Sequence, residues 1–250
     1  MGKDVIIACD FSSAEETYAF LERFGEARPF VKIGMELYYA EGPKIVKLLK
    51  DRGHKVFLDL KLHDIPNTVQ KAMRVLGRMD VDLCNVHAAG TEKMMRAALE
   101  GLSAGAAEGK DAQAAVREAA AMQTAGRPLL IAVTQLTSTS QEQLASDIMI
   151  DRPMEEVVAA YARHAKKAGL DGVVCSPLEA PAVHERLGEQ FLTVTPGVRL
   201  AGDDAGDQRR VTTPARAKVL GSDYIVVGRS ITAAADPKAA YERCCAEFID

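Results

Sequence analysis

The sequence predicts a single α/β domain, a (β/α)8 barrel that spans residues 1–250. Two observations predict it: short apolar runs recur eight times along the chain, and segments of helical composition separate them. Alternation of strands and helices produces a parallel sheet with right-handed crossovers. Eight such repeats in 250 residues match the size at which the sheet closes into a barrel. An open doubly wound sheet is the alternative.

Most of the predicted strands are continuous apolar runs, as expected for strands that are covered on both faces. They span residues 5–9, 30–34, 55–60, 83–87, 129–134, 172–176, 192–195 and 224–227. Helices are predicted at 15–24, which follows two serines, and at 42–52 and 154–167, which each end shortly before a glycine. The Ala-rich stretch 101–126 is longer than one crossover needs, so we predict an extra helix there, outside the barrel.

The composition argues against several classes of partner. Hydrophobic residues make up 48% of the chain and charged residues 26%, which is typical of a globular domain. A net charge of −4, without a basic tail, argues against nucleic acid. No apolar stretch approaches the roughly 20 residues of a membrane-spanning helix. Residues 3–9 resemble a strand more than a signal peptide, so we expect a cytoplasmic protein with its five cysteines reduced.

Charged residues stand at the ends of three successive predicted strands. The third strand ends in Asp59 and Lys61, which share one face because they are two positions apart. Asp10 follows the first strand, Lys32 lies within the second, and Asp64 follows in the loop after the third. Chemistry in such barrels is located at the C-terminal strand ends. We therefore expect these charges at one mouth of the barrel, with a rim network of salt bridges as the alternative interpretation.

Two loops that contain glycine and arginine follow the seventh and eighth predicted strands. The first holds Gly197 and Arg199, and the second holds Gly228 and Arg229. The loops after strands 7 and 8 commonly bind phosphate in such barrels, and arginine offers forked donors to phosphate oxygens. Between them, the Gly/Asp-rich stretch 201–208 is typical of a mobile loop, and its Gln208 could close over a ligand. Ordinary turns are the alternative for either loop alone.

The ten residues 59–68, Asp-Leu-Lys-Leu-His-Asp-Ile-Pro-Asn-Thr, resemble the signature of the orotidine 5′-monophosphate decarboxylase family. Five further segments appear in the family's order: the strand ending in Asp10, the run 30–34, the run 133–138, and the two loops with glycine and arginine. The resemblance covers essentially the whole chain. The full ten-residue block is specific, whereas sugar-phosphate relatives share its Asp-x-Lys-x-x-Asp core.

The resemblance implies roles for individual residues. The catalytic residues would be Lys32, Asp59, Lys61 and Asp64. The substrate-binding residues would be Asp10, Lys32, Asp59, Ile65, Thr68, Thr137, Arg199, Gln208, Gly228 and Arg229. Asp64 and Thr68 are expected to reach into the partner subunit's site, which implies a homodimer. Asp10 and Lys32 would hold ribose hydroxyls. Thr137 would contact the pyrimidine edge, where many family members carry serine.

The implied reaction is decarboxylation of orotidine 5′-monophosphate without cofactor or metal. Loss of CO₂ from C6 leaves a poorly delocalised carbanion, and many decarboxylases supply a cofactor as electron sink. Here fixed charge has to serve instead, so we expect Lys61 to stabilise the carbanion and protonate it. The alternatives are a Mg²⁺-dependent sugar-phosphate decarboxylase or aldolase and a non-catalytic nucleotide-binding barrel. His63 and His87, near the strand ends, are interpreted as rim histidines without a metal.

Overall fold

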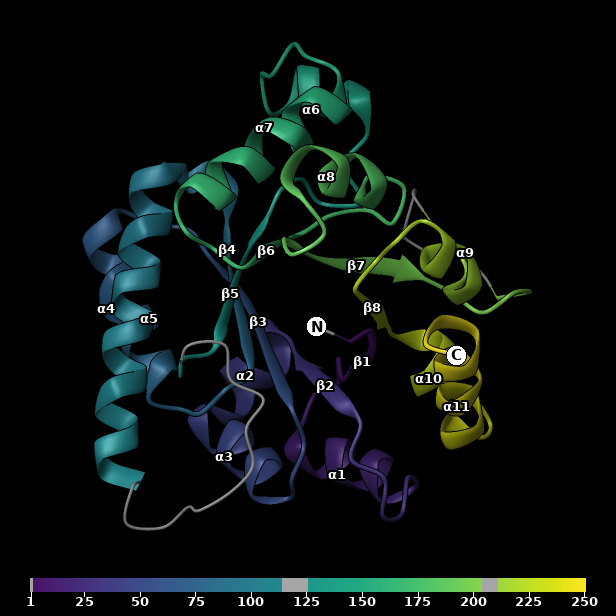
Figure 1. The fold of residues 1–250 in the computed structure, drawn as a ribbon. Coiled ribbons are helices and arrows are strands. Elements are labelled where there is room, and N and C mark those ends of the chain that lie inside the picture. The colour runs from purple at the N-terminus through teal and green to yellow at the C-terminus, as the bar shows by residue number, and fades with distance from the viewer. Residues whose placement is uncertain (1, 114–125, 204–210) are drawn as a thin grey trace.

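The computed structural model describes residues 2–113, 126–203 and 211–250 and shows a closed barrel of eight parallel strands. The strands follow chain order around the barrel (Figure 1). They are β1 (Asp4–Ala8), β2 (Phe30–Ile33), β3 (Val56–Leu62), β4 (Leu83–His87), β5 (Leu129–Val133), β6 (Gly172–Val174), β7 (Leu192–Val198) and β8 (Tyr224–Val227). The predicted (β/α)8, or TIM, barrel is confirmed. The open sheet is wrong because β8 pairs with β1 and closes the ring.

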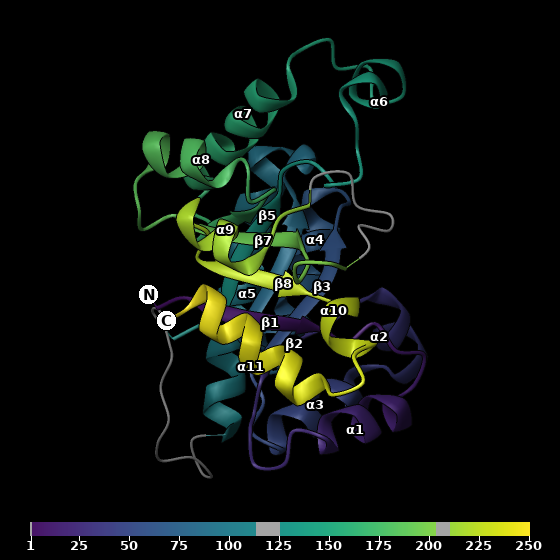
Figure 2. The same ribbon diagram turned by 90° about the vertical axis from the view of Figure 1, so that its right-hand side faces the viewer.

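Helices separate successive strands and cover the outside of the barrel, as Figures 1 and 2 show from two directions. They are α1 (Ala14–Glu22), α2 (Met35–Glu41), α3 (Pro43–Asp51), α4 (Pro66–Gly77), a 3-10 turn (Ala88–Gly90), α5 (Thr91–Gln113), α6 (Gln141–Ser146), α7 (Met154–Lys167), α8 (Ala180–Leu187), α9 (Pro214–Val219), α10 (Arg229–Thr232) and α11 (Pro237–Phe248). The three helices predicted at 15–24, 42–52 and 154–167 correspond to α1, α3 and α7. Within the described ranges, no helix has both the length and the apolar character that crossing a bilayer requires.

The alternation of side chains along the strands decides which residues face the barrel axis. An interior core is formed by Ile6, Ala8, Phe30, Phe57, Leu83, Ile131, Val194, Tyr224 and Val226. In β3, Phe57 belongs to this interior, so Asp59, two positions further on, faces the same way. Leu58 and Leu60 belong instead to the outer core beneath the helices. The strand therefore carries its charged side chain toward the mouth of the barrel.

The extra helix predicted at 101–126 is wrong for the part that the structure describes. Residues 101–113 continue α5 without a break, and 114–125 lie outside the described residues. The length and Ala-rich composition of 101–126 predicted the extra helix, although Gly101, Gly105 and Gly109 would each weaken a helix interior. These glycines instead lie at four-residue spacing on one helix face, where they contact α4.

The contact between α4 and α5 brings the two helix backbones unusually close together. A Cβ at Gly101 would lie 2.0 Å from the backbone oxygen of Gln70, and one at Gly105 would lie 2.0 Å from that of Arg74. Real side-chain atoms cannot approach a backbone so closely. Figure 1 shows the two helices running side by side. The glycines therefore fix the position of α4, whose first three residues, 66–68, belong to the signature segment 59–68.

Three aspartates tie neighbouring strands together at the N-terminal end of the barrel. Each directly precedes an even-numbered strand and accepts a hydrogen bond from a backbone N–H near the start of the preceding odd-numbered strand. The aspartates are Asp82, Asp171 and Asp223, and their donors are Val56, Leu130 and Thr193, at 2.7, 2.7 and 2.8 Å. Their side-chain partners are Lys50, Arg127 and His184. These three aspartates at the N-terminal end of the barrel therefore have structural roles. The charged residues with candidate catalytic roles lie at the C-terminal end.

The α4–α5 contact predicts different effects for the same substitution at two positions of α5. Gly105→Ala should lower the free energy of unfolding by about 1–3 kcal/mol, because overpacking outweighs the helix propensity of alanine. Gly109→Ala is the matched control, because its added Cβ would lie 3.3 Å from Arg78 Cα. Denaturant unfolding followed by circular dichroism measures both. Equal stability of the two variants would contradict the close backbone contact at Gly105.

Candidate active site

Four charged side chains form a row at the C-terminal ends of β1, β2 and β3. Lys32 Nζ lies 2.8 Å from Oδ1 of Asp10 and 3.4 Å from Oδ2 of Asp59. Lys61 Nζ lies 2.7 Å from Oδ1 of Asp59. The row therefore alternates in sign from Asp10 through Lys32 and Asp59 to Lys61. The structure brings together the four charges that the sequence placed at one mouth of the barrel.

Lys32 and Asp59 form the buried middle of this row, with side chains only 11% and 10% exposed. Burial alone would lower the pKa of Lys32, but the carboxylates of Asp59 and Asp10 outweigh burial and hold the pKa above its ordinary value. Burial alone would raise the pKa of Asp59, but Lys32 and Lys61 hold it below its ordinary value. Both side chains therefore stay charged near neutral pH, each stabilised by opposite charge on two sides.

Lys61 adopts a backbone conformation that is uncommon for a residue with a side chain. Its φ is +52°, in the left-handed region, and the pairing of β3 with β4 shifts register around it. Its N–H donates to Oδ1 of Asn85 at 2.8 Å, and Nδ2 of Asn85 donates to Oδ1 of Asp59 at 2.7 Å. Asn85 thus contacts both charged residues of β3.

Asn85 is absent from the residues predicted from the sequence. It lies in β4 and is fully buried, at 1% exposure. A signal for it exists, because this amide interrupts an otherwise apolar run two positions after Leu83, which faces the barrel interior. A buried polar side chain needs partners, and an inward-facing one near a strand end finds them at the active-site mouth.

Two histidines stack beside the row. The rings of His63 and His87 lie 5.8 Å apart between centroids, with an angle of 29° between their planes. Burial lowers the pKa of His87, and the nearby His63 and Lys61 lower it further. Among residues 2–113, 126–203 and 211–250, no group of three or more His, Cys, Asp or Glu side chains is placed to hold a metal ion.

The loop between β3 and α4 turns its side chains outward. Asp64, Ile65 and Thr68 are exposed, and Ile65 is 66% exposed despite being apolar. Oδ1 of Asp64 accepts the N–H of Ile65 at 2.5 Å. Among the described residues, no ion pair joins Asp64 to Lys61 or Lys32. Asp64 is therefore not one of the ion-paired members of the row in the described part of its own chain.

The two loops with glycine and arginine lie at the ends of β7 and β8, next to β1. Gly197 has φ of +80° in β7, where the pairing with β8 shifts register. Arg199 is buried, and its Nη1 donates to the carbonyl of Val198 at 2.9 Å. Gly228 precedes α10, and Arg229, the first residue of that helix, is exposed. Both loops stand at the same end of the barrel as the charged row.

Thr137 and Gln208 are the remaining residues that the family resemblance assigned to the site. Thr137 is buried in the loop that follows β5, at the C-terminal end of the strands. Gln208 lies outside the described residues.

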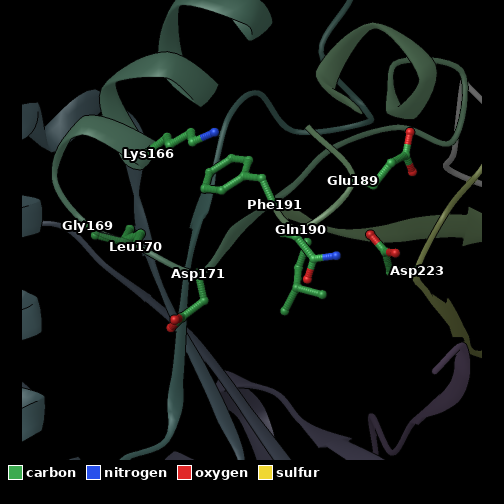
Figure 3. A pocket seen from close by; sticks show the side chains of 9 residues that line it. Lys166, Gly169, Leu170, Asp171, Glu189, Gln190, Phe191 and Asp223 are labelled. Carbon is green, nitrogen blue, oxygen red and sulfur yellow. The ribbon is translucent and has the colours of Figure 1, made fainter. Parts of the chain in front are cut away.

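A hollow of about 640 Å³ lies at the opposite, N-terminal end of β6, β7 and β8 (Figure 3). Its carboxylates are spread around the rim in Figure 3 and do not converge on one point. Asp171 is bound by Arg127, and Asp223 is bound by His184. Because two of the carboxylates serve the base of the barrel, we locate the candidate active site at the charged row and not at this hollow.

Comparison with known proteins identifies the family. The family model described as "Orotidine 5'-phosphate decarboxylase / HUMPS family" matches residues 3–244. The chain belongs to this family.

Relatives named orotidine 5'-phosphate decarboxylase agree with the assignment to the orotidine 5'-phosphate decarboxylase / HUMPS family. One from Bacillus cytotoxicus is 55% identical over 242 residues, covering 97% of this chain and 95% of the relative. One from Geobacillus sp. strain WCH70 is 55% identical over 248 residues, covering 99% and 98%. The resemblance predicted from residues 59–68 is confirmed.

Solved structures agree as well. The crystal structure of orotidine 5'-phosphate decarboxylase from Lactobacillus acidophilus matches with a TM-score of 0.83 and 42% identity, covering 99% of this chain and 100% of that one. A Geobacillus kaustophilus structure, described as an uncharacterized conserved protein, matches with a TM-score of 0.81 and 50% identity, covering 98% and 99%.

Apart from Gln208, the residues implied by the family resemblance fall into three regions of the described structure. The first is the row of four charges at the ends of β1 to β3. The second is the exposed loop 64–68. The third comprises the loops after β5, β7 and β8. All three belong to the C-terminal end of the barrel, where enzymes of this fold carry their active sites.

Proposed function

We propose that this chain is a carboxy-lyase that converts orotidine 5′-monophosphate to uridine 5′-monophosphate and CO₂, the last step of de novo UMP synthesis. The observation that carries the proposal is the alternating row of Asp10, Lys32, Asp59 and Lys61 at the barrel mouth. The row places a fixed ammonium beside a fixed carboxylate, which is what a reaction that replaces a carboxylate with a carbanion needs. Relatives 54–55% identical carry the name of this activity.

The substrate would span from the charged row to the two loops with glycine and arginine. Asp10 and Lys32 would bind the ribose hydroxyls, and Thr137 the pyrimidine edge. Arg199, Gly228, Arg229 and Gln208 would bind the phosphate. Binding energy at the phosphate, remote from C6, can organise the reacting end of the site.

Lys61 would carry the chemistry at C6. The bond between C6 and the carboxylate breaks, CO₂ leaves, and the electron pair stays on C6 in the plane of the ring. The Lys61 ammonium stabilises this pair electrostatically and then transfers a proton to it, leaving a neutral amine and the product C6–H bond. No cofactor is needed in this scheme, because the protein supplies the charge that an electron sink would otherwise supply.

Asp59 would lie beside the substrate carboxylate and repel it. The repulsion falls as CO₂ departs, which favours the transition state over the bound substrate. Asp59 also holds Lys61 in place through the 2.7 Å ion pair. We rank the repulsion below the contribution of Lys61, because stabilisation of developing charge is usually the largest single effect in an active site.

The site would be completed by a second copy of the chain. Asp64 and Thr68, with Ile65 between them, are exposed, and Asp64 forms no ion pair with Lys32 or Lys61 among the described residues. An exposed carboxylate and an exposed apolar side chain on one loop suit a surface that another subunit covers. Asp64 of each subunit would then approach Lys61 of the other, so we propose a homodimer. The cytoplasmic location stays a prediction from the sequence.

The direct test is the absorbance change of orotidine 5′-monophosphate on mixing with the purified protein, with and without EDTA. The proposal expects turnover that EDTA leaves unchanged. Activity that is abolished by EDTA and restored by Mg²⁺ would favour the metal-dependent alternative. Binding of the nucleotide without turnover would favour a non-catalytic barrel.

Substitution of Lys61 should remove the chemistry and leave the fold. Lys61→Ala is expected to reduce kcat/KM by about three or more powers of ten, because a group that stabilises transition-state charge typically contributes a factor of about 10²–10³ and proton transfer adds to it. Steady-state kinetics measures this, and circular dichroism checks the fold. Lys44→Ala, on the exposed face of α3, is the control. Near-normal turnover by Lys61→Ala would contradict the mechanism.

Substitution of Arg229 should affect recognition of the phosphate. Arg229→Ala is expected to raise KM for orotidine 5′-monophosphate by roughly tenfold or more, since a charge-assisted hydrogen bond contributes about 1.5–3 kcal/mol. Turnover of orotidine, which lacks the phosphate, should be unchanged by the substitution. An equal loss with both substrates would remove Arg229 from the phosphate site.

The shared site predicts that two inactive variants restore activity when mixed. In a hybrid of Lys61→Ala and Asp64→Asn subunits, one of the two sites would contain both native residues. Mixing the variants after subunit dissociation should therefore give roughly a quarter of wild-type activity, since half of the dimers are hybrids when exchange is random. Each variant mixed with itself is the control. Lack of restoration, with hybrid dimers shown by mass spectrometry, would place Asp64 in its own subunit's site.

A further inference from the structure

We propose that Asn85 is a positioning residue for the decarboxylation, because its single side chain holds both the backbone of Lys61 and the carboxylate of Asp59. The inference rests on the proposed function and adds a residue of β4 to a site otherwise built on β1 to β3.

The contacts of Asn85 close a ring with the two charged residues. Its Oδ1 accepts the N–H of Lys61 at 2.8 Å, and its Nδ2 donates to Oδ1 of Asp59 at 2.7 Å. The same Asp59 oxygen lies 2.7 Å from Lys61 Nζ. The two ends of the Lys61 residue, its backbone N–H and its ammonium, are thus tied to one another through Asn85 and Asp59.

The strand pairing explains why a side chain makes this contact. Leu58 of β3 pairs with Cys84 of β4, and Leu62 pairs with Val86, so four steps along β3 face two along β4. The extra residues of β3 bulge away from the regular ladder. The Lys61 N–H therefore needs an acceptor other than the neighbouring backbone, and the Asn85 side chain provides it from β4, the strand opposite the bulge.

The backbone of Lys61 depends on such support. A residue with a Cβ is disfavoured at φ of +52°, and such conformations persist where the surrounding structure holds them. The hydrogen bond from Lys61 to Asn85 is one restraint that holds it. Since Asn85 is 1% exposed and lies within a strand, it offers a rigid anchor.

The bond from Asn85 to Asp59 has a second consequence for the reaction. When Lys61 gives its proton to C6, its amine no longer attracts Asp59 as an ion. The Asn85 amide keeps its hydrogens throughout, so its bond to Asp59 persists in both protonation states of Lys61. Asp59 thereby keeps its orientation while Lys61 is neutral, and the site is ready for Lys61 to regain a proton.

The test compares Asn85→Ala, which removes both hydrogen bonds, with Asn85→Asp, which keeps the acceptor for Lys61 and replaces the donor to Asp59. Thr17→Val is the control, since Thr17 is buried in α1 and donates to the carbonyl of Ser13 away from the site. For each protein we would measure kcat and KM for orotidine 5′-monophosphate, the Kd of uridine 5′-monophosphate, and the melting temperature.

The proposal expects Asn85→Ala to lower kcat about a hundredfold, because a displacement of about 1 Å in a catalytic group can cost that factor. KM and the Kd of uridine 5′-monophosphate should change by less than about threefold, since the phosphate and ribose contacts remain. Asn85→Asp should lower kcat at pH 7 at least as much, through the like charge beside Asp59. Thr17→Val should lower the melting temperature and leave kcat unchanged.

The Asn85→Asp variant also provides a readout that a purely structural role would not move. A protonated Asp at position 85 can again donate to Asp59, so its kcat should rise relative to wild type as the pH falls. The other titratable groups that face this pair in the described chain are Asp10, Lys32, Lys61, His63 and His87. They are common to wild type and variant, so the ratio of the two kcat values isolates position 85.

Each remaining outcome overturns a stated claim. A kcat for Asn85→Ala within about twofold of wild type, with a lowered melting temperature, would make Asn85 structural and overturn this inference alone. If Asn85→Ala does not fold, a pH-independent kcat ratio for Asn85→Asp decides against it. Absence of turnover in the wild type would overturn the proposed function and this inference together. The wild-type assay therefore distinguishes that failure from a failure of this inference alone.

Discussion

The candidate site depends on one nearly buried ion pair, that between Lys32 and Asp59. Removing either partner would leave a nearly buried charge with only one, more exposed, opposite charge beside it, which is more costly than losing an exposed salt bridge. The pair is stable because each member has a second ion-pair partner: Lys32 also pairs with Asp10, and Asp59 also pairs with Lys61. The alternation fixes each side chain before substrate binds, so little reorganisation remains for the reaction itself.

The row of four charges was predictable from the sequence, because side chains along a strand alternate between its two faces. Asp59 and Lys61 are two positions apart, and the strands that carry Asp10 and Lys32 precede them in chain order. The sequence marks Asn85 only as a polar residue within an apolar strand, and its role could not be predicted, because that role follows from the shift in register between β3 and β4, which is a tertiary feature. The sequence also predicted an extra helix over 101–126, whereas residues 101–113 continue α5; the contact of the α5 glycines with α4 is likewise a tertiary feature.

Two sets of charged residues lie at opposite ends of the barrel and have different roles. At the N-terminal end, aspartates accept backbone N–H groups and hold neighbouring strands in register. At the C-terminal end, carboxylates and ammonium groups face one another across the mouth, where a substrate can use them. Asp64 belongs to neither set within one chain, because it is exposed on the loop that leads into α4. This exposed position is the basis of the proposed homodimer.

The central claim is that Lys61 stabilises and protonates a carbanion at C6. It is tested most directly by the exchange of the C6 proton of uridine 5′-monophosphate in D₂O, followed by proton NMR, because this exchange passes through the same carbanion without decarboxylation. Deuterium is expected at C6 in the presence of wild-type protein, and Lys61→Ala should lose the exchange. Exchange at wild-type rates with Lys61→Ala would contradict it.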